Sequence, residues 1–159
     1  MKDKRFVIQK HETADGVHWD LMLEQDEVLT TFRLEEPPEQ ALVHPVRAER
    51  IFDHPLRFLW YEGPVQKGTG RVHIVERGSW RPVGCDWRVG EAWQSEAELG
   101  DGPLSTPSPI RPRRTRLPPC RFILEGVILS GMFTLIRTSE TGWRFAVEGA
   151  DADPDHLPR

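Results

Sequence analysis

Residues 5–33 of the chain read RFVIQKHETADGVHWDLMLEQDEVLTTFR, and polar and apolar side chains alternate along most of this stretch. Alternation with a period of two is typical of β-strands that bury one face. Short polar breaks at 12–16 and 25–27 interrupt the pattern where chain reversals are expected. The sequence therefore predicts a three-stranded antiparallel meander, with strands at 5–10, 17–24 and 28–33.

The rest of the chain continues in short strands with one long interruption. Between residues 84 and 119 the pattern dissolves into Gly, Pro, Ser, Glu and Arg, which predicts an irregular insertion with room for a helical turn or two at 91–99. Many short strands, glycine turns and few helix caps indicate an all-β barrel or sandwich with little helical content. Further strands are predicted at 71–77, 79–82, 121–127, 131–137 and 142–147, with Gly78 ending the first of them.

The composition is that of one soluble domain. The chain has 159 residues, of which 38% are hydrophobic and 29% charged. At this length a chain buries roughly 70% of the surface that its unfolded form exposes, so a metal ion is expected to serve chemistry rather than folding. No apolar run approaches the about 20 residues of a membrane span, and the first residues lack the apolar core of a signal peptide. We expect a cytoplasmic protein with a single domain over 1–149 and a flexible acidic tail over 150–159.

The net charge bears on nucleic-acid binding. A net charge of −4 argues against a protein that coats nucleic acid by bulk electrostatics. The strong basic run at 111–116 fits a grip on the phosphate backbone and fits a solvated loop equally well. Any action on nucleic acid must therefore come from a local site.

The cysteines are too few for a disulfide framework. Cys85 and Cys120 also lack the spacing of a metal knuckle. We expect two buried or unreactive thiols, because the cytosol is reducing. The alternative is a disulfide between the two cysteines, which would close the long polar segment.

The most informative spacing is His18-x-Asp20 within a predicted strand. Side chains at i and i+2 project from the same face with Cα atoms about 6.6 Å apart, so an imidazole and a carboxylate can meet at one cation. His11 ends the preceding strand and returns to this place if the two strands pair. Two imidazoles and one carboxylate leave positions for water and substrate, which is a catalytic arrangement.

Two other interpretations of the His-x-Asp spacing stay open. It fits an exposed His-Asp pair without a metal. It also fits an iron-dependent oxygenase, whose facial triad is completed by a distant histidine, and His73 is available for that place. The second interpretation leaves His11 without a role.

Several ordered blocks of the sequence are similar to one known family. The blocks RFVIQKH at 5–11, HWDLMLE at 18–24 and DHPL at 53–56 with Glu62-Gly63 resemble the 3′-phosphoesterase domain of bacterial DNA ligase D. Residues 70–80 and 124–143 resemble later strands of that family. The resemblance implies a compact closed or partly closed β-barrel, with 84–119 as an insertion, that trims 3′ ends of nucleic acid with manganese.

The resemblance also implies a role for individual residues. It makes His11, His18 and Asp20 the metal ligands, places Gln9 beside the metal and places His54 against the scissile phosphate. A divalent ion neutralises phosphate charge and lowers the pKa of bound water, and a histidine exchanges protons with the reacting oxygens. The ligand types suit Mn²⁺ but also Zn²⁺ and Fe²⁺, so the identity of the ion follows from the resemblance alone.

Three positions depart from the family pattern. Met22 stands where the family has an arginine two residues after the metal-binding aspartate, and a thioether cannot replace a bidentate cation. Phe58 stands where the family has a tyrosine. Glu35 and Glu36 lie where the family has a lysine. The metal pocket is retained in the sequence, whereas the anion clamp is reduced.

Arginines near these blocks are candidates for the missing contacts with phosphate. Arg47 and Arg50 precede the His54 block and Arg57 follows it, so we predict these three as substrate-binding residues. Arg33 also lies close to the blocks. A solvated surface position is the alternative for each.

The sequence thus predicts a stand-alone, diverged phosphoesterase of the DNA ligase D type. Its expected activity is metal-dependent removal of a 3′-phosphate or a 3′-terminal ribonucleoside during DNA repair. The expected partners are nucleic-acid 3′ ends and a separate ligase or polymerase, with no membrane. The alternative is a catalytically impaired module on the same fold that binds DNA ends or a repair protein.

Overall fold

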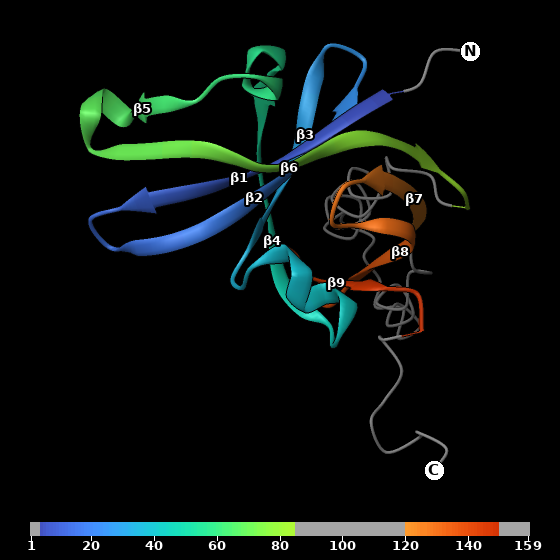
Figure 1. Cartoon of the computed structure of the whole chain (residues 1–159). Helices are drawn as coiled ribbons and strands as arrows, with labels where there is room; N and C mark the ends of the chain where they lie inside the picture. Colours follow the sequence, from blue (N-terminus) through green and yellow to red (C-terminus); the bar gives the residue numbers. More distant parts are fainter. Residues whose placement is uncertain (1–3, 85–119, 150–159) are drawn as a thin grey trace, which may run out of the picture.

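The strands predicted from the alternating pattern are present, and they join into one sheet (Figure 1). The computed structural model describes residues 4–84 and 120–149. The sheet consists of β1 (Lys4–Thr13), β2 (Gly16–Gln25), β3 (Val28–Leu34), β4 (Val46–Pro55), β5 (Gly63–Val65), β6 (Gly70–Pro82), β7 (Cys120–Gly126), β8 (Ser130–Arg137) and β9 (Gly142–Val147).

Pairing between β1 and β6 closes the sheet into an antiparallel barrel. The strand order is β1-β2-β3-β4-β9-β8-β7-β6, and β6 then pairs with β1 along the whole length of β1. Strand β5 pairs only with the first residues of β6 and stands outside the barrel, at the upper left of Figure 1. The prediction of an all-β closed barrel is therefore confirmed.

Helical structure within the described ranges is limited to three 3₁₀ segments. They are η1 (Pro38–Leu42), η2 (Leu56–Leu59) and η3 (Gln66–Gly68). Pro37 and Pro38 start η1, where a missing amide proton costs nothing. No helix in residues 4–84 or 120–149 is long and apolar enough to cross a membrane.

Side chains from all eight barrel strands fill the interior. Three phenylalanines pack against one another there: the ring centroids of Phe133 and Phe145 are 5.4 Å apart, and Phe122 stacks on Phe145 at 6.2 Å. Trp80 and Trp143 belong to the same cluster. The interior of the barrel, as far as the described residues form it, is therefore an apolar core.

Strands β1 and β2 are also buried on their outer face. Alternate residues such as Phe6 and Ile8 point into the barrel, whereas Val7 points outward and joins a second apolar cluster with Met22, Leu29 and Leu59. Leu59 comes from η2, which packs on this outer face. This outer cluster explains why β1 and β2 contain continuous apolar runs, and it leaves the polar ends of both strands beside it.

Several elements differ from those predicted. Strands β4 and β5 were not predicted, and Gly78 lies inside a continuous β6 instead of ending a strand. A Cβ at Gly78 would lie 2.1 Å from the backbone oxygen of Glu125, so glycine here permits the close approach of β7. The sequence signal for a turn came from a glycine that serves strand packing.

Some predictions fall on residues that the structure does not describe. All but the first residue of the predicted insertion at 84–119, including its basic run at 111–116, and the tail at 150–159 lie outside the described ranges. Cys120 is buried and disulfide-bonded, against the expectation of an unreactive thiol, while Cys85 lies outside the described residues.

A buried carboxylate on β6 fixes the hairpin between β7 and β8. Glu76 is 3% exposed and accepts hydrogen bonds from the backbone N–H groups of Val127 (3.1 Å), Ile128 (2.7 Å) and Leu129 (2.7 Å). Its own neighbour Arg77 donates a fourth backbone N–H at 3.0 Å. Each carboxylate oxygen thereby accepts two donors, so both must be acceptors.

The substitution Glu76→Gln tests this role. Glutamine places an NH₂ group against two N–H donors, and we expect the free energy of unfolding to fall by about 1–3 kcal/mol. Urea denaturation measures the change. Glu125→Gln, at an exposed position on β7, is the matched control and should leave the midpoint unchanged; equal midpoints for the two variants would contradict the role of Glu76.

Candidate metal centre and catalytic site

The register of β1 and β2 brings the predicted metal ligands together. His11 pairs with His18, and Gln9 pairs with Asp20. Directly paired residues of antiparallel strands project from the same face. All four side chains therefore share the outer face of the barrel, next to the outer cluster. The i, i+2 spacing in the sequence predicted this for His18 and Asp20, and the expected strand pairing predicted it for His11.

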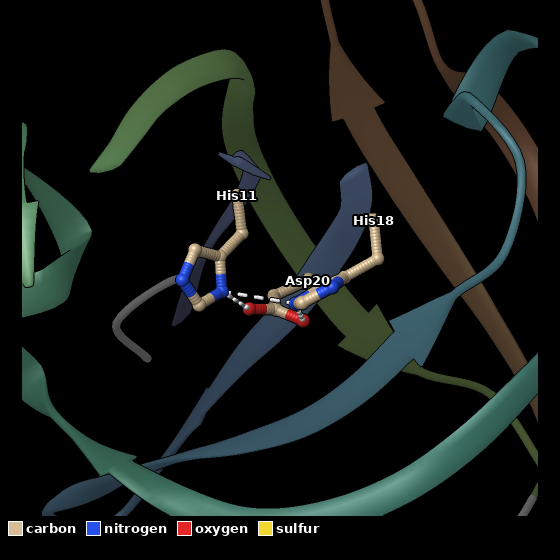
Figure 2. Close-up of side chains that lie close together, drawn as sticks. All are labelled: His11, His18 and Asp20. Atoms are coloured by element: carbon tan, nitrogen blue, oxygen red, sulfur yellow. Dashed lines mark hydrogen bonds and ion pairs between the residues drawn. The ribbon is translucent and has the colours of Figure 1, made fainter. Parts of the chain in front are cut away.

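The three side chains converge closely (Figure 2). Nδ1 of His11 lies 2.9 Å from Nε2 of His18, and Nε2 of His18 lies 3.6 Å from Oδ1 of Asp20. One potential ligand atom from each residue lies within 4.8 Å of the others, so a single cation can contact all three. The arrangement stands on the rigid pairing of two strands and needs no loop.

The protonation states favour a cation. Burial lowers the pKa of His11, and the charge of Arg33 lowers it further. Burial, with Arg33 and His11, lowers the pKa of His18 to about 4. Burial raises the pKa of Asp20 to about 6, against the opposing effect of Arg33. At pH 7 both imidazoles are therefore neutral and the carboxylate is mostly ionised, which is the state that a metal requires.

An unpartnered polar atom supports a metal at this place. Within the described residues, Oδ1 of Asp20 is buried and has no hydrogen-bond partner, whereas the unpartnered Nε2 of His11 points away from the other two ligands (Figure 2). A buried polar atom without a partner is costly, so such an atom points to a missing ligand or water. Two imidazoles and a carboxylate fit Mn²⁺, Zn²⁺ and Fe²⁺ alike, and the donor set does not choose among them.

Gln9 connects the metal centre to the segment after β4. Its Nε2 donates to the backbone oxygens of Phe58 (3.0 Å) and Tyr61 (2.9 Å). Since both partners are acceptors, the orientation of the amide is determined. Its Oε1 is left buried and, among the described residues, without a partner. Gln9 thus holds the wall of the site and offers one further oxygen beside the candidate ligands.

A β-bulge directs His54 to the same face. Leu29 pairs with His54 and Thr31 with Ile51, so β4 carries one extra residue between them. Without it, Asp53 would take the outward position and His54 would turn inward. Nδ1 of His54 lies 3.0 Å from Oγ1 of Thr31.

The contacts of His54 determine its tautomer. Nδ1 also lies 3.1 Å from the backbone oxygen of Phe52, which only accepts, and the hydroxyl of Thr31 donates to the backbone oxygen of Leu29. Nδ1 therefore carries the proton, and Nε2 is the nitrogen available to a substrate. Burial lowers the pKa of His54, so this Nε2 holds a lone pair at neutral pH.

A cavity of about 240 Å³ joins the metal centre to His54. Gln9, His11 and Asp20 line it together with His54 and Arg57. The cavity thus has carboxylate, imidazole and guanidinium groups facing a common space.

The predicted arginines lie in different places. Arg57 lines the cavity and covers the ring of Phe58 at 4.9 Å. Arg47 is exposed on β4 opposite Arg144, away from the cavity lining. Arg50 forms an ion pair of 3.3 Å with Asp53 and lies over the ring of Phe32.

Arg33 places a cation beside the candidate metal ligands. It pairs with Asp20 across β2 and β3, and its Nε lies 3.6 Å from Oδ1 of Asp20, beyond hydrogen-bond distance. Its charge lowers the pKa of His11, His18 and His54. Sequence analysis placed Arg33 only near these blocks, because its position opposite Asp20 depends on the strand register.

The departures from the family pattern have clear positions. Met22 is fully buried in the outer cluster. Phe58 lies 5.3 Å from the ring of His54, and Glu36 forms an ion pair of 3.3 Å with His44. His73 pairs with Lys10 on the barrel wall and does not belong to the group of potential metal ligands found in the described residues.

Comparison with known proteins agrees with this geometry. The sequence profile of the DNA Ligase D 3′-phosphoesterase domain matches residues 9–137. The chain belongs to this family.

The chain is also similar to two proteins named multifunctional non-homologous end joining protein LigD. The protein of Pseudomonas aeruginosa is 31% identical over 98% of the chain, and that of Mycolicibacterium smegmatis is 34% identical over 87%. The chain spans 16% of the length of each relative.

The ligand assignment predicts which histidines bind metal. We expect His11→Ala and Asp20→Asn to weaken Mn²⁺ binding by more than the about 10–100-fold that loss of an outer-shell partner costs. His73→Ala should bind Mn²⁺ as the unaltered protein does, since the described structure keeps it out of the ligand group. Titration calorimetry measures the affinities. The opposite ranking would support the oxygenase interpretation.

A glycine at the start of β6 leaves room for His11. A Cβ at Gly70 would lie 2.9 Å from Nε2 of His11 and 3.0 Å from Oε1 of Gln66. Gly70→Ala should therefore displace the imidazole and weaken Mn²⁺ binding about tenfold, with every ligand retained. Gly84→Ala, which meets no atom within 4 Å, is the control for calorimetry. Equal affinities for both variants would show that the ring tolerates the methyl group.

Proposed function

We propose that this chain is a metal-dependent phosphoesterase that removes a 3′-phosphate or a 3′-terminal ribonucleoside from nucleic acid in DNA repair. The observation that carries the proposal is the convergence of His11, His18 and Asp20 beside a cavity that His54 also lines. Family membership supports the choice of phosphoester chemistry. Mn²⁺ is the proposed ion because the resemblance of the sequence blocks implies it.

The side chains divide the work of phosphoester hydrolysis. A divalent ion held by the three ligands would neutralise phosphate charge and supply an activated water. Gln9 holds the cavity wall and presents its oxygen beside the ligands. His54 accepts a proton at Nε2 from a water or a phosphate hydroxyl, and returns it to the leaving oxygen. Thr31 and the Phe52 carbonyl hold the ring so that Nε2 stays in position.

Two arginines are proposed to bind the phosphate. Arg57 lines the cavity, and Arg33 places a second guanidinium beside Asp20. Guanidinium groups suit phosphate because they offer two parallel N–H donors. Arg33 thereby supplies a positive charge next to the ligands although Met22 carries none. Arg47 and Arg50 stay predictions for more distant parts of a nucleic acid.

Met22 favours a second candidate function. Its buried thioether cannot contact an anion, so the chain is alternatively a module that binds DNA ends or a repair protein without releasing product. Under either function the proposed partners are nucleic-acid 3′ ends and a separate ligase or polymerase. The proposed location is the cytoplasm, where such nucleic-acid ends occur.

An end-processing assay separates the two functions. Primer–templates ending in a 3′-phosphate or a single ribonucleotide are incubated with Mn²⁺, Mg²⁺ or Zn²⁺. We expect product with Mn²⁺, none with Asp20→Asn, and about 10²–10⁴-fold slower release with His54→Ala, since that variant lacks the proton acceptor. His73→Ala should keep the full rate. Binding of the duplex without product under every ion would instead establish the binding module.

A further inference from the structure

An exposed aromatic ring forms part of the cavity wall. Phe52 is 73% exposed and lines the same cavity as His11, Asp20 and His54. Single exposed apolar residues are common and by themselves indicate nothing. Phe52 differs because it belongs to the site and because one side of its ring is ordered against another residue of the site.

The ring of Phe52 is stacked on His54. The two centroids are 4.9 Å apart and the planes differ by 12°. A third aromatic ring is near: the ring of Phe58 lies 5.3 Å from that of His54, tilted by 59°. With one side of the Phe52 ring on His54 and most of its surface exposed, the opposite side is open to a further planar group.

The chemistry of the surroundings indicates which planar group fits. Arg57 covers the ring of Phe58 at 4.9 Å and also lines the cavity, so a cation accompanies the aromatic rings. Aromatic rings with nearby guanidinium groups are the usual means of holding bases and phosphates of single-stranded nucleic acid. One sugar joins the base of a terminal nucleotide to its 3′-phosphate, so a base-binding ring must stand directly beside the phosphate-binding histidine.

We propose that Phe52 stacks on the base of the 3′-terminal nucleotide while the 3′-phosphate of that nucleotide enters the cavity between the metal ligands and His54. This inference rests on the proposed function and names its substrate class: nucleotide ends, in preference to phosphoesters without a base. Stacking does not discriminate among bases, because each base has a π face, so the site accepts any terminal base.

The experiment compares two primer–templates in binding and in turnover. Both end in a 3′-phosphate, but one carries a base on its terminal nucleotide and the other carries an abasic sugar. Fluorescence anisotropy without added metal gives the dissociation constant, and phosphate release with Mn²⁺ gives KM and kcat. Phe52→Ala should weaken binding of the base-bearing end by about 5–100-fold and raise its KM similarly, with the abasic end changed less than about twofold.

Matched variants make the result specific. Phe52→Trp should retain binding of the base-bearing end, since an indole also stacks. Trp60→Ala removes another exposed ring, at the end of η2 and outside the cavity lining, and should leave the dissociation constants unchanged. Equal losses for Phe52→Ala on both ends, or equal losses for Phe52→Ala and Trp60→Ala, would overturn the inference.

The two readouts separate this inference from the proposed function. Base-dependent binding without phosphate release would refute the phosphoesterase and uphold the stacking. Phosphate release that Phe52→Ala leaves unchanged on the base-bearing end would uphold the phosphoesterase and refute the stacking. A ring that instead serves a protein partner would show no difference between the two ends, which also refutes it.

Discussion

The antiparallel register of β1 and β2 is the constraint on which both the core and the candidate site depend. The same pairing that sends Ile8 and Leu21 into the barrel turns Gln9 and Asp20 to the outer face. A shift of one residue would reverse every side chain and bury an imidazole and a carboxylate among phenylalanines. Because β1 also pairs with β6, such a shift would break hydrogen bonds on both of its edges.

The candidate site lies on the outside of the barrel for a physical reason. The inward positions of the strands carry the apolar core, so the polar residues of the site occupy outward positions of the same strands. Here η2 packs on the barrel wall through Leu59, and the amide of Gln9 donates to Phe58 within η2 and to Tyr61 after it. The outer cluster and the cavity are consequently parts of one structure, anchored to β1 and β2.

The sequence sufficed for the elements whose signal is periodic. Period-two alternation predicted β1 to β3, and the i, i+2 rule put His18 and Asp20 on one face before any register was known. It did not predict the bulge that directs His54 outward, because an extra residue leaves no periodic trace. The glycine at position 78 led to the wrong prediction of a strand end. The sequence alone does not show whether a glycine permits a turn or the close approach of a neighbouring strand.

Met22 and Arg33 lie on the same outer face, on the neighbouring strands β2 and β3, but in different environments. Met22 is fully buried with Val7 and Leu59, where a guanidinium would lose its hydration without gaining a partner. Arg33 is paired with Asp20 across β2 and β3, and its side chain is 35% exposed. Its charge therefore stays hydrated while it lowers the pKa of His11 and His18. The outer face of β2 is thus apolar at Met22, and the positive charge next to Asp20 comes from Arg33 on β3.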